Sequence, residues 1–297
     1  MSWFFGLHNY SKPGRGVSKD ELPKTGIALY FDILIRRIWK IVGLNFIYIA
    51  FSIPAIVISF FLSTYMSAWV ASVVEINLSG EFGTTLSLIG LCMTIVLLQI
   101  CGSGPASASI TYVLRKYVND THSWVWGDFI DNIKSNFLQG MAVYAINIFV
   151  TIAFVVGYTF YTHIMSGTVA FVFRGFITAL ALIFVLMQMY IYQLMAGFRL
   201  SVKKIYKYAA ILAIVKLPWN VFSAVVLIAL MWLVYELFMS YPFIAVVLLL
   251  TLFFSMLTFT QLFMTNNVVK KHIKTTSEVK DEETEKLAEP DFEDNVN

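Results

Sequence analysis

The sequence predicts an all-α membrane protein, a six-span helical bundle with amphipathic elbow helices at the membrane interface. Of its 297 residues, 59% are hydrophobic and 13% are charged, and the mean hydropathy is +0.75. A soluble domain has about 25% charged residues, so most of this apolar surface is expected to face lipid. Six apolar runs qualify as membrane spans, and they lie at about 41–63, 84–101, 138–161, 172–196, 219–240 and 243–265.

The chain divides into three parts by composition. Residues 1–26 are polar and rich in glycine and proline, which predicts a loop-like N-terminal segment. Residues 27–266 contain all the apolar runs and form the membrane domain. Residues 267–297 are charged, acidic toward the end and poor in aromatic residues. Such a composition buries too little apolar surface to fold, so we predict a disordered acidic tail.

Amphipathic segments precede three of the spans. Each places apolar residues at helical spacing on one side and charged residues on the other, as in helices that lie in the membrane interface. They comprise residues 27–40, 128–139 and 199–216. In the first, Asp32 stands four residues before Arg36, the favourable order for an ion pair along a helix. Asn45, Asn136 and Asn220 lie near the three span starts, a pattern that fits either a threefold repeat or chance placement.

The distribution of lysine and arginine predicts the orientation. Seven of these residues precede the first span, three lie in 102–137, five in 199–218 and five in the tail, whereas the alternate loops hold none. By the positive-inside rule, both termini are expected in the cytoplasm of a multi-pass cell-membrane protein. The alternation also favours an even number of spans. The lipid bilayer is therefore the first expected partner, and the basic residues are placed to meet anionic headgroups.

Sequence motifs for enzymatic chemistry are absent. The chain has no phosphate-binding loop, no HExxH, no CxxC and no GxSxG. Cys92 and Cys101 are nine residues apart, which fits neither a metal site nor a redox pair. We therefore predict no enzyme activity, no catalytic residue, no cofactor and no metal. The basic residues lie beside the spans and not on a polar face, which argues against nucleic-acid binding.

The segment 102–140 carries most of the candidate functional residues. Gly104 and Pro105 lie in a run of small residues, which indicates either close helix packing with a kink or a broken helix that lines a pathway or hinge. Arg115 and Lys116 form a basic pair that follows the run. The segment as a whole is a candidate docking or gating surface.

Four further candidates follow in the same segment. His122 could sense pH or bind a ligand, although a lone loop histidine more often does neither. Trp124 and Trp126 fit interfacial anchors. Asp128 is placed to be the N-cap of the next helix.

Two charged residues fall within predicted spans, near their outer ends. Arg174 and Glu236 either serve a function inside the membrane, extend to the outer interface, or form an ion pair with one another. Amide side chains within the spans are expected to bond across helices, and they are Gln99, Asn147, Gln188, Gln193 and Gln261.

The stretch GPASASITYVLRKYVNDTHSWVWGDFIDNIKSNFLQG resembles the signature of the YesL-like bacterial integral membrane proteins, a family without assigned function. Leu44–Val57 is similar to the first span of that family, and the likeness covers about 30–220. The resemblance implies an origin in Gram-positive bacteria and genes encoded beside carbohydrate uptake systems. It implies an accessory or regulatory role, with a carbohydrate ABC transporter or another membrane protein as partner. The alternative is a small transporter in its own right.

Overall fold

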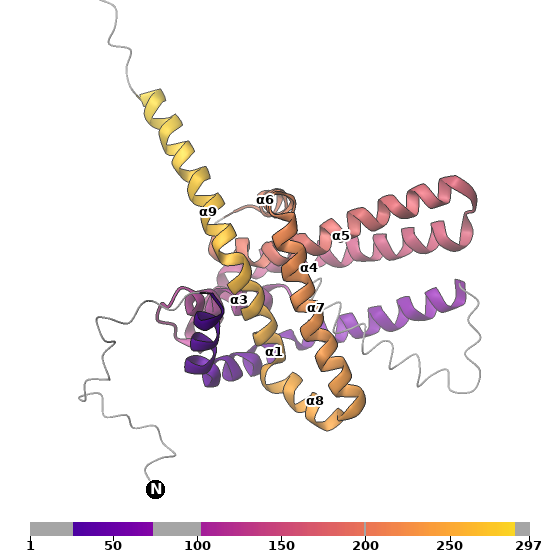
Figure 1. Ribbon diagram of the computed structural model, residues 1–297, viewed down its shortest axis with the longest axis horizontal. Coiled ribbons are helices and arrows are strands. Elements are labelled where there is room, and N and C mark those ends of the chain that lie inside the picture. The colour runs from indigo at the N-terminus through magenta and orange to yellow at the C-terminus, as the bar shows by residue number, and fades with distance from the viewer. Residues whose placement is uncertain (1–25, 74–101, 199, 289–297) are drawn as a thin grey trace, which may run out of the picture. The chain divides into compact units, whose positions relative to one another are not determined.

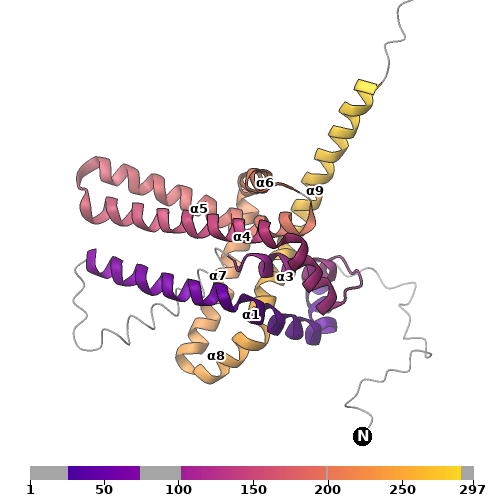
Figure 2. The same ribbon diagram turned by 180° about the vertical axis from the view of Figure 1, so that it is seen from behind.

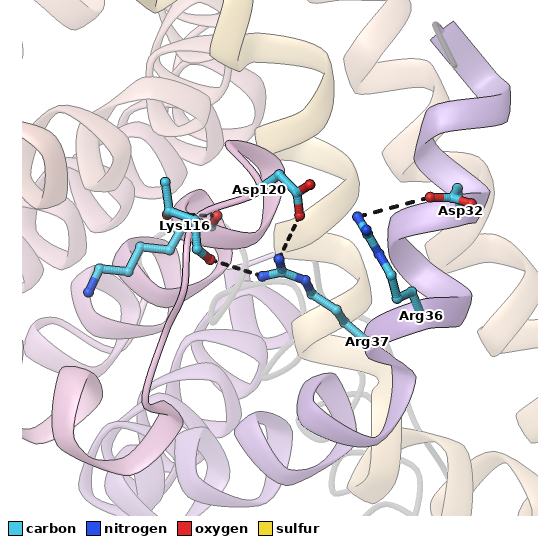
Figure 3. A network of polar contacts seen from close by, with 6 residues as sticks. Asp32, Arg36, Arg37, Lys116 and Asp120 are labelled. Atoms are coloured by element: carbon cyan, nitrogen blue, oxygen red, sulfur yellow. Dashed lines mark hydrogen bonds and ion pairs between the residues drawn. The ribbon is translucent and has the colours of Figure 1, made fainter. Parts of the chain in front are cut away.

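The computed structural model describes residues 26–73, 102–198 and 200–288, with side chains as far as Lys271. Within these ranges every regular element is a helix and no strand occurs, as predicted. The chain divides into two compact units, residues 1–36 and 37–297. In the first unit, Arg36 lies 4.0 Å from Asp32, the predicted pair one turn apart (Figure 3).

The first helix, α1 (Gly26–Val73), is one continuous element of 48 residues. It contains both the amphipathic helix predicted over 27–40 and the first predicted span, 41–63, which follows it directly. The sequence around Lys40 and Ile41 contains no proline and no turn-forming pair that would end the helix there. At about 1.5 Å per residue, α1 is more than twice as long as the hydrocarbon core is thick.

The middle of the chain forms a short helix and then a long helical hairpin. The short helix is α3 (Pro105–Val118), and α4 (Val125–Thr159) follows it. The π-helix η1 (Phe160–Ile164) ends α4, and α5 (Gly167–Gly197) returns beside it, as Figures 1 and 2 show.

The predicted elbow at 128–139 and the span at 138–161 are two halves of α4. Asn136, with φ −114° and ψ 15°, is not helical and marks their boundary. Its Nδ2 donates to the Asn132 carbonyl at 3.3 Å. A side chain that bonds to the backbone in this way competes with the helical ladder, which is consistent with a kink there.

The remaining elements are α6 (Val202–Val215), α7 (Leu217–Ser240), α8 (Pro242–Leu248), the π-helix η2 (Leu249–Phe253) and α9 (Phe254–Ala288). Helix α6 confirms an amphipathic helix within 199–216, and Tyr241 marks the expected turn between α7 and α8. Helix α9 runs to Ala288 and so includes most of the residues of the predicted tail, whose disorder stays a prediction. Lysine and glutamate are the commonest residues of this stretch, and both favour the helical state even without a core.

Five helices in the described part are long and apolar enough to cross a membrane. They are Gly26–Ser72, Val125–His163, Gly167–Gly197, Leu217–Ser240 and Pro242–Lys271, and each contains one of the predicted spans. The other predicted span, 84–101, lies outside the described residues, so the count of six stays a prediction. The chain is a helical membrane protein by these five segments.

Helix α3 forms the centre of the described structure. It packs against α4, α5 and α9, and its first seven residues, Pro105 to Thr111, are all buried. All of their side chains except that of Ile110 are small, so neighbouring backbones approach closely. Ser109 and Thr111 donate to the carbonyls four residues earlier, at 2.9 and 2.7 Å, which satisfies hydroxyls that have no access to water.

Candidate functional site around helix α3

A cluster of hydroxyl groups surrounds the start of α3. Ser52 of α1 donates to Ser103 at 2.8 Å, and Ser107 Oγ accepts from the Ser103 backbone N–H at 2.8 Å. Tyr48 of α1 lies 3.3 Å from Ser107 through their hydroxyl oxygens. All four side chains are buried. The cluster therefore ties α1 to the segment that enters α3.

Gly104 and Pro105 stand at the start of α3. Pro105 occupies the first helical turn, where its missing N–H has no partner to lose, and Gly104 has a φ of +65° that favours glycine. A Cβ atom on Gly104 would lie 3.1 Å from the Gly140 carbonyl oxygen, and one on Gly140 would lie 2.7 Å from the Pro105 nitrogen. This contact of α3 with α4 is the close packing expected of the small residues.

Arg37 of α1 holds the end of α3 (Figure 3). Its Nη2 donates to Asp120 Oδ1 at 2.7 Å, and its Nη1 donates to the Thr121 carbonyl at 3.2 Å. The guanidinium carbon lies 4.8 Å from the centroid of the Tyr117 ring. Burial raises the pKa of Tyr117 to about 12, although the Arg37 charge acts in the opposite direction. No local sequence pattern predicts this contact of Arg37, because its partners are more than 80 residues away along the chain.

Lys116 and Asp128, two of the predicted site residues, form an ion pair with Nζ and Oδ1 2.9 Å apart. The other carboxylate oxygen accepts from Ser123 Oγ at 2.7 Å and from the Trp124 backbone N–H at 2.9 Å. Burial alone would lower the pKa of Lys116, but the hydrogen bond and the charge of Asp128 outweigh it and raise that pKa. The pair fixes the turn between α3 and α4.

The prediction of Asp128 as the helix N-cap was wrong, because the cap position of α4 is Trp124. Asp128 lies in the first turn and accepts a hydrogen bond from the N–H of the cap residue. In a capping box the third helical residue makes this bond, and here Asp128 makes it from the fourth helical position. Asp128 thus still stabilises the N-terminal end of α4, but from within the helix and not from the cap position.

The turn that this ion pair fixes presents aromatic side chains at the surface. Trp124 is 75% exposed and Trp126 is 61% exposed, and His122 beside them is also exposed. Trp126 lies 6.3 Å from Phe51 of α1 between ring centroids. The structure thus presents two large apolar side chains on a rigid support, which suits either an interfacial anchor or a docking contact.

Arg115 points to a different place from Lys116. Its guanidinium carbon lies 4.9 Å from the centroid of the Phe198 ring at the end of α5. Its Nη1 atom is buried and has no hydrogen-bond partner in the described part of the chain. The two neighbouring basic residues therefore differ: Lys116 is paired with a carboxylate, and Arg115 packs against an aromatic ring.

Arg174 and Glu236 do not form the ion pair that was one of the alternatives. Glu236 is exposed on α7, and Arg174 is half-buried on α5 with a buried Nε atom that lacks a partner. The ion pairs found among the described residues are Asp32–Arg36, Arg37–Asp120 and Lys116–Asp128. An exposed charge near a span end fits extension toward the membrane surface.

Buried amide side chains bond across helices, as predicted. Asn147 of α4 and Gln188 of α5 exchange two hydrogen bonds, at 3.0 and 3.2 Å, and Tyr206 of α6 donates to Asn147 at 2.7 Å. Gln261 of α9 donates to the Met189 carbonyl at 2.9 Å. These contacts join α4, α5, α6 and α9. Gln99 lies outside the described residues.

Asn45 and Asn220 bond to the backbone of other helices. Asn45 Nδ2 donates to the carbonyls of Leu249 and Leu250 in η2, at 3.2 and 2.8 Å, and its Oδ1 accepts from the Ser255 N–H at 2.9 Å. Asn220 Nδ2 donates at 2.9 Å to two carbonyls in the last turn of α6, and Tyr190 donates to its Oδ1. Both side chains are fully buried. Each satisfies carbonyls that a regular helix leaves open at a π-turn or a C-terminus.

The described residues contain no group of three His, Cys, Asp or Glu side chains that could hold a metal ion. Cys92 and Cys101 lie outside the part of the chain that the structure describes.

Comparison with known proteins gives one match. The sequence model of the family described as "Protein of unknown function, DUF624" matches residues 41–158. No curated protein and no solved structure matches the chain. The matched region includes α3 and its contacts with α1 and α4, so the segment with most of the candidate residues is also the segment that is similar to a family of unknown function.

Proposed function

We propose that this protein is a non-enzymatic accessory or regulatory component of carbohydrate uptake, and that it docks on a membrane partner through the turn between α3 and α4. The observation that carries the docking role is the exposure of Trp124 and Trp126 on a turn fixed by the Lys116–Asp128 ion pair. Exposed aromatic residues on a rigid support are common anchors of protein interfaces. The link to carbohydrate uptake, with an ABC transporter as partner, rests on the YesL-like resemblance.

The internal polar contacts support a scaffold more than a substrate path. Asn45, Asn147 and Asn220 are fully buried, and each bonds to protein groups on neighbouring helices. Polar groups that line a substrate path need free bonding capacity toward the substrate. Here the amides hold helices together.

Affinity capture from native membranes tests this function. We expect a carbohydrate permease to co-purify with the wild-type chain, and we expect the double change Trp124→Ala and Trp126→Ala to reduce its yield at least fivefold. Trp39→Ala is the matched control, because Trp39 lies on α1 outside the α3–α4 turn sequence and is 83% exposed. Capture of no permease, or equal yields from all three chains, would contradict the proposal.

A small transporter is the second candidate, and the entry into α3 favours it. Residues 102–104 precede α3 without helical structure, beside the hydroxyls of Ser52 and Ser107. Broken helices with nearby polar groups form substrate sites in many transporters. Flux of a sugar or an ion into liposomes that contain only this protein would favour transport. No flux, together with permease capture, would favour the accessory role.

A further inference from the structure

The guanidinium of Arg115 lacks a counter-charge in the described part of the chain. The two carboxylates at the same end of α3 are occupied, since Asp120 binds Arg37 and Asp128 binds Lys116. The Phe198 ring offers only a weak attraction to the cation. A charged group withdrawn from water without an anion is unfavourable. Consistent with this, burial lowers the pKa of Arg115.

Two more buried polar atoms near this place also lack partners, Gln193 Nε2 and Asn266 Oδ1. Gln193 is 2% exposed and Asn266 is 3% exposed. The other amide atom of each is used: Gln193 Oε1 accepts from Thr265 at 3.1 Å, and Asn266 Nδ2 donates to Asn119 at 2.9 Å. Each amide therefore has one atom bonded to a neighbouring helix and one atom free.

The contacts show that these atoms surround one junction of α3, α5 and α9. On α3, Asn119 follows Arg115 by one turn and donates to its carbonyl at 3.0 Å. On α5, Gly197 follows Gln193 by one turn, and a Cβ atom on Gly197 would overlap Arg115 Nη1. On α9, the partner of Gln193 is Thr265 and the partner of Asn119 is Asn266, the next residue along the chain. These contacts thus bring α3, α5 and α9 together at the residues that carry the free atoms.

The free atoms define the chemistry of a ligand. Arg115 and Gln193 offer donors, so the ligand carries acceptor oxygens and negative charge. Asn266 offers an acceptor, so the ligand also carries a hydroxyl. An ionised carboxylate has no hydroxyl that could donate to Asn266. A phosphate with a P–OH group, or a phosphodiester with a glycerol headgroup, has both, and arginine is well suited to phosphate oxygens.

We propose that the junction of α3, α5 and α9 binds a phosphate group, either of an anionic lipid headgroup or of free inorganic phosphate. Arg115 and Gln193 donate to its oxygens, and Asn266 accepts from its hydroxyl. This site is independent of the proposed docking turn, because Trp124 and Trp126 take no part in it.

Thermal unfolding of the full chain, followed by tryptophan fluorescence, tests the site and separates the two sources. In the first arm, the chain in detergent is titrated with inorganic phosphate, with chloride at equal ionic strength as the reference. In the second arm, nanodiscs of phosphatidylcholine are compared with nanodiscs that contain phosphatidylglycerol. We expect the unfolding temperature to rise in at least one arm. If it rises in neither, the proposal is wrong.

Two variants and a control identify the residues. Arg115→Gln removes the charge and should weaken the response at least tenfold. Gln193→Glu keeps the shape, places a carboxylate beside the guanidinium and should abolish the response while the chain stays folded. Lys203→Gln is the control, because Lys203 is exposed on α6 and its loss removes one positive charge elsewhere. A wild-type response in Arg115→Gln and Gln193→Glu, or an equal loss in Lys203→Gln, would overturn the proposal.

Discussion

At the scale of single residues, asparagine side chains hold this membrane domain together by binding backbone carbonyls. Asn136 binds within its own helix, Asn220 binds the end of the preceding helix, and Asn45 binds a helix about 200 residues away in the sequence. The sequence shows that all three lie near span starts. It does not show their partners, because a side-chain amide can pair with any open carbonyl that the fold brings near.

Asn45→Leu should destabilise the chain. The change leaves the Leu249 and Leu250 carbonyls and the Ser255 N–H without a partner in a buried place, at a cost of about 1–3 kcal/mol. Thermal unfolding in detergent measures the effect. Phe46→Leu, at the exposed neighbouring position, serves as control and should change the unfolding temperature little. Equal unfolding temperatures for Asn45→Leu and the wild type would rule out this role of Asn45.

The ion pair of Lys116 and Asp128 should make stability depend on alkaline pH. Because the pKa of Lys116 is raised in the folded chain, the pair stabilises the fold below the ordinary lysine pKa of about 10.4. The stabilisation is lost as pH rises through the higher folded value. The difference in unfolding temperature between wild type and Lys116→Met should therefore be present at neutral pH and shrink in strongly alkaline buffer. A difference that stays constant over this range would contradict the assignment.

At the scale of elements, the sequence predicts helices well and their boundaries less well. Apolar runs and amphipathic stripes locate α4, α5, α6 and α7, because lipid and interface impose those patterns directly. The end of α9 at Ala288 was not predicted, since composition reports what a segment can bury and not where a helix must stop. The start of α3 at Pro105 follows from proline chemistry, but its burial among three other helices depends on tertiary packing.

Gly140→Ala should disturb the contact of α3 with α4. The added Cβ would lie 2.7 Å from the Pro105 nitrogen, so one backbone has to move. We expect a cost of about 1–3 kcal/mol, as for an overpacked core. Gly175→Ala is the matched control, because a Cβ on this α5 glycine has nothing within 4 Å. In the control, helix propensity should instead leave stability unchanged or raise it by up to about 1 kcal/mol. The same response in both variants would argue against close packing.

At the scale of the whole molecule, hydropathy alone identifies a membrane protein, because five of the predicted spans lie in helices long and apolar enough to cross. The candidate site was only partly predictable. Local sequence pointed to Arg115, Lys116, Trp124, Trp126 and Asp128. The anchor Arg37 and the amides Gln193 and Asn266 enter through contacts between distant segments, which no local pattern records.

The orientation remains a prediction with a direct test. With six spans, both termini and the α3–α4 turn should lie in the cytoplasm, while the turn at Tyr241 should lie outside. Single cysteines at His122 and Tyr241, in a chain with Cys92 and Cys101 replaced, can be probed with a membrane-impermeant thiol reagent on intact cells. Only the cysteine at 241 should react. Labelling at 122 alone would reverse the orientation, and labelling of both would contradict the span count between them.

The contact of Asn45 with η2 has a consequence for how this chain can vary. A π-turn contains one residue more than the α-helical path needs, and one residue corresponds to a rotation of about 100° around the helix. Deletion of a single residue within Leu249–Phe253 would therefore turn α8 to present a different face to its surroundings. It would also remove the open carbonyls that Asn45 binds. The length of the last hairpin and the identity of residue 45 are thus linked, and a change in one calls for a change in the other.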